Sequence, residues 1–283
     1  MSPAAADLKR PEARKLLVVD LDGTLLTTGK TITEKNLQAI RDLTGQGHCF
    51  AFATGRPVQS ALPLAREYGF DRLGSFYIIA YNGALLYDCA ANRTIYTRPM
   101  ARSDVRLIFD EAAKAKIHCH TYDKSHVISE RETAMLKEYT RVIKMPPLVV
   151  EDAAAFLDVE PLKVICADLY DRSRLEKFEQ RIAPLIGNRL ESVFSSDMLL
   201  EYNAAGADKG NGMLKLCKLL GVRPENTVAA GDQENDLALL RAAGLSCAMA
   251  NGTEALKRQA DYVTENDNDH DGIAEIINGK ILK

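Results

Sequence analysis

Near its start the chain reads Leu16-Leu17-Val18-Val19-Asp20-Leu21-Asp22-Gly23-Thr24. The first four residues form a short apolar run with two β-branched valines, which is typical of a strand buried on both faces of a parallel sheet. Asp20 and Asp22 follow where this strand should end, and Gly23 gives the backbone freedom to turn. Open α/β sheets bind their ligands at the carboxyl ends of the strands. The segment therefore predicts a buried strand with functional acids at its end.

The two acids also have a purely structural interpretation, because Asp and Gly are common turn residues. That interpretation accounts for a single Asp-Gly pair, but not for two acids at alternate positions directly after a buried strand. Such carboxylates repel one another unless a cation lies between them. Mg²⁺ is a hard divalent cation that prefers oxygen ligands. We therefore expect Asp20 and Asp22 to lie at a magnesium site.

Two further strands alternate with helices after this opening segment. Helices are expected at 34–46 and 57–68, and buried strands at 48–53 and 76–80. Strands and helices in regular alternation predict the α/β class, with a parallel sheet and right-handed crossovers. The expected core is a Rossmann-like, doubly wound parallel sheet.

The pattern changes between about Leu86 and Ser196, where shorter strands carry polar residues at alternate positions around two expected helices. Half-buried strands with helices on one side indicate an inserted α+β cap domain. The buried-strand pattern returns at Leu199. The predicted organisation is a flexible N-terminal tail at 1–14, an α/β core domain at 15–85 and 197–283, and a cap domain at 86–196.

Composition and charge narrow the classes of function. The chain has 283 residues and a formal net charge of −3, with charges of both signs mixed along it, so nucleic acid is not an expected partner. No apolar run is long enough to cross a membrane, and the first 15 residues lack the apolar core of a signal peptide. The six scattered cysteines fit small core residues in a reducing compartment. We expect a soluble, cytoplasmic monomer or homodimer.

Three further polar clusters lie next to predicted strands or helices. Thr54-Gly55-Arg56 follows the second strand and offers a hydroxyl, an amide and a guanidinium to an anion. Lys209 stands at a helix entry, and Gly231-Asp232-Gln233-Glu234-Asn235-Asp236 follows a later strand. Each has a structural alternative: a threonine cap, a surface lysine, and acids favoured at a helix start. These alternatives would require every cluster to fall at one edge of one sheet by coincidence.

In this order and spacing, the clusters resemble the four motifs of the haloacid dehalogenase-like superfamily of phosphohydrolases. The specific part of the resemblance is Asp20-x-Asp22-Gly23-Thr24 combined with Gly231-Asp232-x-x-Asn235-Asp236. The Cof-type (IIB) branch, whose cap is inserted after the third core strand, is the most similar. Asn82-Gly83-Ala84 and Ala250-Asn251-Gly252 also look similar to that branch. The resemblance covers all but the N-terminal tail, although the cap matches in length and layout rather than in motif.

The resemblance implies a role for each cluster. Asp20 is the nucleophile that forms an aspartyl-phosphate, and Asp22 protonates the leaving alcohol and then activates the hydrolytic water. Lys209, also catalytic, neutralises charge on the nucleophile and the phosphate. The implied ligands of Mg²⁺ are Asp20, Asp22 through its main-chain carbonyl, Asp232 and Asp236, and those of phosphate are Thr54, Gly55 and Asn235. Arg56, Asn82 and Asn251 are candidates for contacts with substrate or between cap and core.

The expected enzyme is therefore a Mg²⁺-dependent phosphatase of small phosphorylated metabolites, such as sugar phosphates or phosphorylated cofactors. A phosphomutase similar to phosphomannomutase is an alternative that the motifs do not separate from it. A non-catalytic, metabolite-binding regulatory protein is a second alternative. Such a protein is free to lose Asp20, Asp22, Lys209 and Asp232, all of which this chain retains.

Three histidines of the predicted cap, His118, His120 and His126, allow a metal-site interpretation. His118 and His120 share one face of a predicted strand, as two metal ligands would. No further ligand with suitable spacing accompanies them, so a structural role is the preferred interpretation. A third interpretation is that this strand face contacts the leaving group of the substrate.

Overall fold

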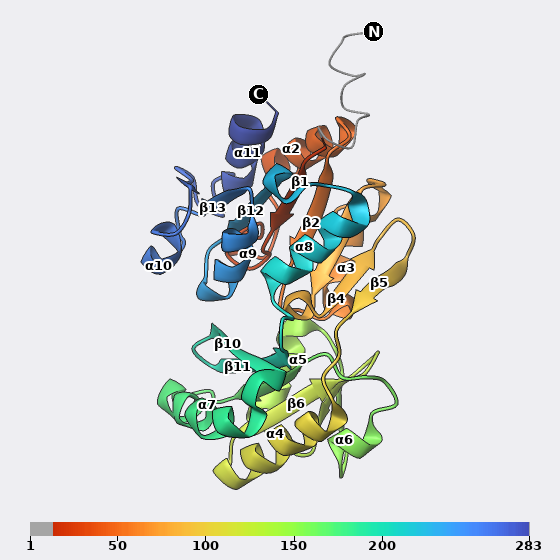
Figure 1. Cartoon of the computed structure of the whole chain (residues 1–283), viewed down its shortest axis with the longest axis vertical. Helices are drawn as coiled ribbons and strands as arrows, with labels where there is room; N and C mark the ends of the chain where they lie inside the picture. Colours follow the sequence, from red (N-terminus) through yellow and green to blue (C-terminus); the bar gives the residue numbers. More distant parts are fainter. Residues whose placement is uncertain (1–13, 283) are drawn as a thin grey trace.

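The computed structural model describes residues 14–282 and consists of two stacked domains, each built on one sheet (Figure 1). Of the tail predicted at 1–14, all but Arg14 lies outside the described residues. The core sheet has eight strands: β1 (Leu16–Val19), β2 (Cys49–Ala53), β3 (Phe76–Ala80), β4 (Leu85–Asp88), β5 (Arg93–Thr97), β12 (Thr227–Gly231), β13 (Leu245–Ala248) and β14 (Tyr262–Val263). The cap sheet has six: β6 (His118–Tyr122), β7 (Val127–Ser129), β8 (Pro147–Val149), β9 (Val164–Ala167), β10 (Leu190–Ser196) and β11 (Leu199–Ala204).

The core sheet confirms the predicted doubly wound α/β fold. Its strand order is β14-β13-β12-β1-β2-β3-β4-β5, and all neighbours from β14 to β3 are parallel. The chain builds outward from β1 in one direction through β2 and β3, and later in the other through β12 and β13. The carboxyl end of β1 is therefore the point at which the strand order reverses, where open α/β sheets bind ligands.

Helices cover both faces of the core sheet because alternate residues of each strand face opposite layers. Leu17 of β1 belongs to the same apolar cluster as Ile40 of α2, whereas Leu16 belongs to the cluster of Met213 of α8. Thr33 caps α2 by accepting a hydrogen bond from the Asn36 amide, as its position before the helix predicts. The core helices are α2 (Glu34–Gly45), α3 (Val58–Glu67), α8 (Lys209–Leu220), α9 (Leu237–Ala242), α10 (Glu254–Lys257) and α11 (Gly272–Ile276).

The cap has the strand order β10-β11-β9-β6-β7-β8, and most of its neighbours are antiparallel. Its helices are α4 (Arg102–Ala115), α5 (Ala134–Ile143), α6 (Ala153–Phe156) and α7 (Arg172–Ile186). Helices α4 and α7 lie on the side of the cap sheet that faces away from the core (Figure 1). The opposite side of the sheet is left to face α5 and the core domain.

The domain boundaries differ from the predicted ones at both ends of the insertion. β5 and all of β4 except Leu85 fall inside the range 86–196 predicted for the cap, but both strands extend the core sheet as an antiparallel edge hairpin. β5 is partly exposed, so its polar residues resemble those of a half-buried cap strand. Conversely, β11 lies in the range 197–283 predicted for the core, where the sequence has the pattern of a buried strand. It is indeed almost fully buried, yet it pairs with β9 and β10 of the cap. The chain crosses between the two sheets at 98–101 and 205–208.

The cap also contains a helix and a strand beyond the expected elements. α5 adds a third long cap helix, and Pro147 begins the short strand β8. β8 pairs in parallel with β7 at the edge of the cap sheet, where proline costs no ladder hydrogen bond. α5 matters for the site described below because several of its side chains line a cavity shared with the core.

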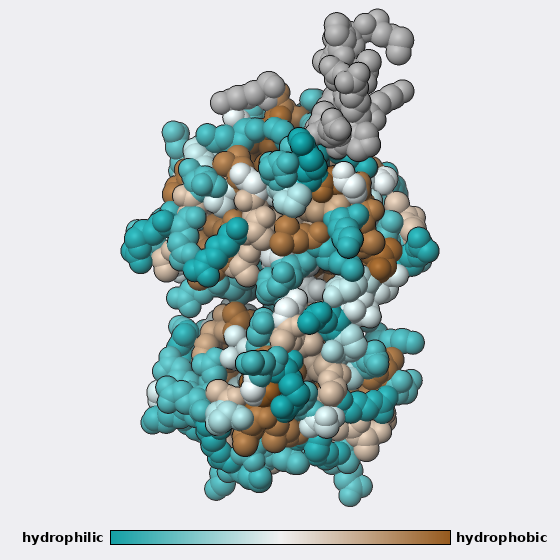
Figure 2. Space-filling view, viewed as in Figure 1, coloured by the Kyte–Doolittle hydropathy of each residue, from teal (hydrophilic) through white to brown (hydrophobic). Residues whose placement is uncertain are grey.

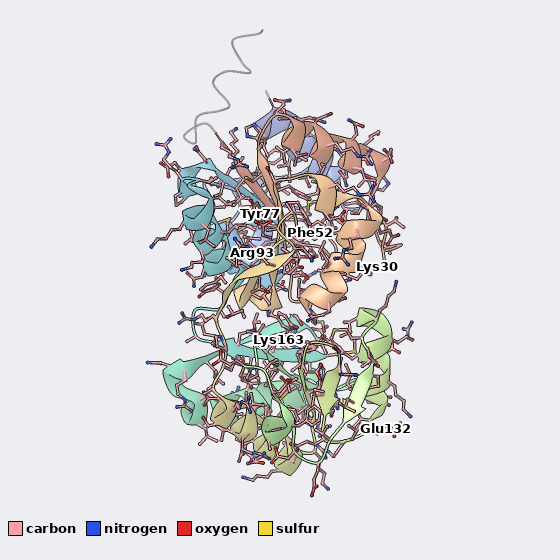
Figure 3. The ribbon with its side chains drawn as sticks, turned by 90° about the vertical axis from the view of Figure 1, so that its right-hand side faces the viewer. Lys30, Phe52, Tyr77, Arg93, Glu132 and Lys163 are labelled. Carbon is pink, nitrogen blue, oxygen red and sulfur yellow. The ribbon has the colours of Figure 1, made fainter. Side chains whose placement is uncertain are left out.

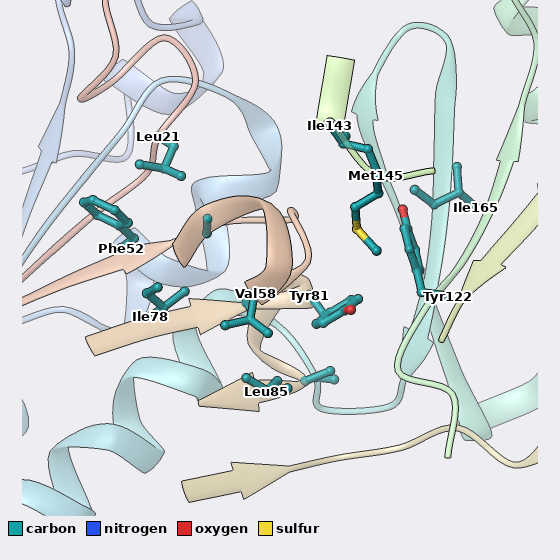
Figure 4. Close-up of a cluster of buried hydrophobic side chains, with 14 of the residues drawn as sticks. Leu21, Phe52, Val58, Ile78, Tyr81, Leu85, Tyr122, Ile143, Met145 and Ile165 are labelled. Atoms are coloured by element: carbon teal, nitrogen blue, oxygen red, sulfur yellow. The ribbon is translucent and has the colours of Figure 1, made fainter. Parts of the chain in front are cut away.

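The two domains share one apolar cluster. Figure 4 shows Val58, Tyr81 and Leu85 on the core side, with Tyr122 and Met145 facing them from the cap, and all five belong to this cluster. The Tyr81 and Tyr122 rings meet edge to face, with centroids 5.6 Å apart and planes at 75°. The cap is therefore packed against the core and not only tethered to it.

The outer surface is dominated by hydrophilic residues on the face shown in Figure 2. All six cysteines are buried and free, as predicted for core residues: Cys49, Cys89, Cys119, Cys166, Cys217 and Cys247. Within residues 14–282, no helix is both long enough and apolar enough to cross a bilayer.

Candidate active site

A buried lysine joins two of the predicted acids beneath the cap. Lys209 is the first residue of α8, and its Nζ lies 2.6 Å from Asp20 Oδ1 and 2.6 Å from Asp236 Oδ1. The helix start is fixed by Asp208, whose side chain accepts a hydrogen bond from the Asn211 amide. Lys209 is 1% exposed, so both ion pairs form out of water. The sequence alternative of a solvated surface lysine is wrong.

Hydrogen bonds hold the acids that follow β12. Asp236 Oδ2 accepts from the amides of Asp232 and Gln233, at 3.0 and 3.3 Å. Asp232 Oδ1 accepts from the Thr24 hydroxyl at 2.8 Å, which ties the turn after β12 to the turn after β1. Gly23 has φ of +82°, and a Cβ there would lie 2.5 Å from Asp232 Oδ2. Only glycine therefore allows the two turns to approach this closely.

Burial and the close spacing of the acids raise the pKa values of Asp20 and Asp232. Burial raises the pKa of Asp20 well above its usual value; Lys209 opposes this, and Asp236 and Asp232 add to it. Burial and the neighbouring Asp236 raise the pKa of Asp232 to about 6, against the Thr24 hydrogen bond. Among the described residues, Asp20, Asp232 and Asp236 form one group whose ligand atoms all lie within 4.8 Å of one another. A hard divalent cation fits this set, since oxygen donors surround it and the site has an excess of negative charge.

Asp22 lies at the same edge but has a different environment. Its carboxylate accepts two hydrogen bonds from the Arg56 guanidinium, at 2.8 and 2.7 Å, and one from Lys30 Nζ at 2.7 Å. Burial alone would raise the pKa of Asp22, but Arg56 and Lys30 together lower it. The Asp22 side chain is therefore held as a carboxylate, away from the group formed by Asp20, Asp232 and Asp236.

The loop after β2 brings the predicted phosphate-binding residues next to Asp20. The Thr54 hydroxyl accepts from the Arg56 amide at 3.1 Å, which closes a tight turn around Gly55. A Cβ on Gly55 would lie 2.9 Å from Asn82 Oδ1, so Asn82 packs directly behind this turn. Asn82 has φ of +57°, and its Oδ1 is buried without a hydrogen-bond partner. Asn82 Nδ2 also donates to Glu201 and Asn203 of the cap, so this residue contacts both the Gly55 turn and the cap.

Sequence reasoning missed a polar cluster that the cap contributes. Lys163, just before β9, lies at the junction of the two domains (Figure 3). Its Nζ donates to the carbonyl of Gly55 at 2.5 Å and to Glu201 Oε2 at 3.0 Å. Glu201 also accepts from Asn82 Nδ2 at 2.6 Å and from Ser195 Oγ at 2.7 Å. Charged residues within otherwise apolar strand sequence were the available signal, because a buried charge requires a partner.

A cavity of about 320 Å³ opens above these residues. The core contributes Asp20, Asp22, Thr54, Gly55, Arg56, Gln233 and Asn235 to its lining, and the cap contributes Lys163, Ser195, Glu201 and mainly apolar side chains. The predicted site residues are thus brought together. Asn82 supports the lining from behind, and Asn251 donates to the carbonyl of Gly23, which is a structural contact.

The cap histidines take the structural role that the sequence favours. His118 Nε2 and His120 Nδ1 lie 3.0 Å apart, and His118 Nδ1 lies 2.9 Å from the Thr133 hydroxyl. Neither histidine lines the cavity, so the face of β6 does not contact a leaving group there. His126 pairs with Asp123 instead, at 3.2 Å. Among the described residues, these histidines form no group able to hold a metal ion.

A buried lysine and three carboxylates at the switch point of a doubly wound sheet, under a cap, are the features of a phosphoryl-transfer enzyme. A model of the haloacid dehalogenase-like hydrolase family matches residues 17–277, and the chain belongs to that family. This confirms the prediction from the motifs, including the Cof-type branch and the class of enzyme, a phosphoric monoester hydrolase.

Similar proteins of known name support the assignment. The chain is 30% identical over 270 residues to the 5-amino-6-(5-phospho-D-ribitylamino)uracil phosphatase of Bacillus subtilis, across 95% of this chain and 96% of that protein. It is 26% identical over 279 residues to the pyridoxal phosphate phosphatase of Escherichia coli, across 95% and 99% of the two chains. A haloacid dehalogenase-like hydrolase from Bacteroides thetaiotaomicron has a similar structure, with a TM-score of 0.85 and 28% identity over 94% of this chain and 99% of that one.

Proposed function

We propose that this chain is a Mg²⁺-dependent phosphatase of small phosphorylated metabolites, acting through an aspartyl-phosphate on Asp20. One observation carries the proposal: Asp20 lines a cavity between core and cap, with its carboxylate held by buried Lys209 and flanked by Asp232 and Asp236. A carboxylate with no catalytic task would gain nothing from burial beside two others.

The first step is transfer of the phosphoryl group to the enzyme. Lys209 holds Asp20 Oδ1, which leaves Oδ2 to attack phosphorus. The bond from phosphorus to the ester oxygen breaks, and the departing alkoxide takes a proton from Asp22. The Thr54 hydroxyl, the Gly55 amide and the side-chain NH2 group of Asn235 belong to residues that line the same cavity, and they would donate hydrogen bonds to phosphate oxygens.

The second step returns Asp20 to its starting state. Asp22, now a carboxylate, accepts a proton from a water molecule that attacks the phosphorus of the aspartyl-phosphate. The bond between phosphorus and Asp20 breaks, which releases inorganic phosphate. The ion pair with Arg56 and Lys30 fits this second task, because it favours the carboxylate form of Asp22. For the first task Asp22 must leave Arg56 and bind a proton.

Asp20, Asp232 and Asp236, together with the Asp22 main-chain carbonyl, would hold Mg²⁺ in this proposal. The ion would offset negative charge that accumulates on the phosphate as it approaches the carboxylates. Lys209 supplies part of the same compensation through its ion pair with Asp20. The small cavity favours small metabolites over protein substrates, since about 320 Å³ is at the low end of ligand pockets.

The test is release of inorganic phosphate from a panel of sugar phosphates, nucleotides and phosphorylated cofactors, with Mg²⁺ and with a chelator. Asp20→Asn should abolish turnover, and Asp42→Asn, an exposed change on α2, should not. Borohydride reduction of enzyme quenched during turnover should convert Asp20 to homoserine, which reports the acyl phosphate directly. Turnover that survives Asp20→Asn would refute the mechanism, and isomerisation of a hexose phosphate without phosphate release would identify a phosphomutase.

A further inference from the structure

The cap side of the active-site cavity is largely apolar. Helix α5 contributes Met135, Val142 and Ile143, and the β10–β11 hairpin contributes Met198 and Leu199. Figure 4 shows Ile143 at the end of α5, on the cap side of the junction. Val142 and Met198 are 53% and 42% exposed, although both line the cavity. Large apolar side chains left open to water at a binding site indicate contact with an apolar ligand.

The buried polar groups on the cap side of the cavity are already paired with one another or with the core. Lys163 Nζ holds the Gly55 carbonyl and Glu201, and Glu201 Oε1 is taken by Ser195. The Tyr139 hydroxyl is bonded to that of Tyr122. Glu138, the remaining charged cap residue in the lining, is about half exposed and pairs with Arg141, so few hydrogen-bonding groups of the cap remain free for a leaving group.

The core side of the cavity has the opposite character. Asp20, Thr54 and Arg56 present charged and polar groups at its floor, where the phosphate would bind. A phosphate on this floor places the rest of the substrate against Val142 and Met198. A sugar in that position would bury hydroxyl groups against apolar side chains without partners, which is unfavourable.

From this geometry we infer that the enzyme prefers phosphomonoesters whose leaving group is a small apolar or aromatic ring, and that Val142 and Met198 determine this specificity. The inference rests on the proposed function, because it assigns the phosphate to the floor of the same cavity. It separates two substrate classes, sugar phosphates and phosphate esters of apolar or aromatic rings, that the catalytic motifs leave equivalent.

Benzyl phosphate and glucose 6-phosphate make a suitable pair of probes. Both are phosphate esters of primary alcohols, so the intrinsic reactivity of the leaving group differs little between them. We expect kcat/KM for benzyl phosphate to be at least about tenfold higher, since one apolar contact changes specificity by about 10- to 200-fold. The comparison uses the full chain with Mg²⁺.

Val142→Thr and Met198→Gln keep the size of each side chain and add polarity to the wall. Each should lower the benzyl-to-glucose ratio of kcat/KM by about fivefold or more, chiefly through KM for benzyl phosphate. Val149→Thr is the matched control, because Val149 is 47% exposed on β8 and does not line the cavity. Circular dichroism would show whether the variants keep their fold.

Two results would overturn the inference while leaving the phosphatase proposal intact. One is equal or faster hydrolysis of glucose 6-phosphate, and the other is a ratio that changes no more in Val142→Thr and Met198→Gln than in Val149→Thr. Absence of phosphate release from every compound of the panel would instead overturn both the proposed function and this inference.

Discussion

The buried ion pair of the cap offers a sharp test of how the fold is stabilised near the domain junction. Lys163 and Glu201 are 1% and 3% exposed, and the lysine also donates to the carbonyl of Gly55. Burial lowers the pKa of Lys163 and Glu201 opposes this, which shows that the charge depends on its partner. Replacing Lys163 by Met keeps most of the side-chain volume but leaves a buried carboxylate without a cation.

Breaking a buried pair by removing one partner typically costs 3–5 kcal/mol of stability. Asn82 and Ser195 still donate to Glu201 in the variant, so we expect Lys163→Met to lower the free energy of unfolding by about 3 kcal/mol, the low end of that range. The Gly55 turn also loses a contact, so kcat/KM should fall. Adding Glu201→Gln should restore much of the lost stability, because the unpaired charge is then absent.

Urea unfolding followed by circular dichroism would measure these differences. Lys137→Met is the matched control, since Lys137 pairs with Glu132 on the surface and both side chains are more than half exposed. Such pairs contribute little, so this variant should remain close to the parent. If Lys163→Met lost no more stability than Lys137→Met, or if Glu201→Gln gave no recovery, the argument from the buried pair would be wrong.

Two further predictions concern the cap and the turn after β3. Burial, with a smaller contribution from Arg131, lowers the pKa of His118 from 6.5 to about 4, so the folded chain binds fewer protons than the unfolded chain between these values. The contribution of His118 to the free energy of unfolding should therefore be fully present above pH 6.5 and fall by about 3 kcal/mol as the pH falls to 4. Unfolding curves of His118→Gln should lack this part of the decline. Gly83→Ala should sharply reduce both stability and turnover, because Gly83 has φ of +101° and a Cβ there would overlap the carbonyl of Asp208, next to Lys209; unchanged thermal unfolding would contradict this.

The clustering of the candidate site residues could be predicted from sequence because the fold itself brings them together. Asp20, Thr54 and Asp232 each follow a buried strand, and the three strands are neighbours at the centre of one parallel sheet. Parallel strands end at a common edge, so recognition of the strands was sufficient to predict that these side chains meet. The conformation of Asp22 was not predictable, since its ion pair with Arg56 joins side chains 34 positions apart in the chain.

The cap was harder to predict for specific physical reasons. Helix α5 was detectable in principle: Thr133 caps it, and Met135, Leu136, Tyr139 and Ile143 are buried with helical spacing. Sheet membership was not detectable, because β11 is buried like a core strand and β5 is exposed like a cap strand. Burial pattern reports how many faces of a strand are covered, and it does not identify the sheet to which the strand belongs.

The contacts of Lys163 also bear on what opening of the cap would cost in free energy. Lys163 and Glu201 both belong to the cap, so opening of the cleft would keep their ion pair and break only the bonds to the Gly55 carbonyl and Asn82. Hydrogen bonds to charged groups are worth about 1.5–3 kcal/mol each, and water can replace them once the cleft opens. Opening at this contact is therefore inexpensive in free energy. Gly55 also lines the cavity where a phosphate would bind. Its carbonyl contacts Lys163 of the cap while its amide is available to the phosphate, so cap closure and phosphate binding depend on the same turn. A phosphate bound to the Gly55 amide would hold this turn in place and so favour the closed cap, which excludes water while the phosphoryl group is transferred.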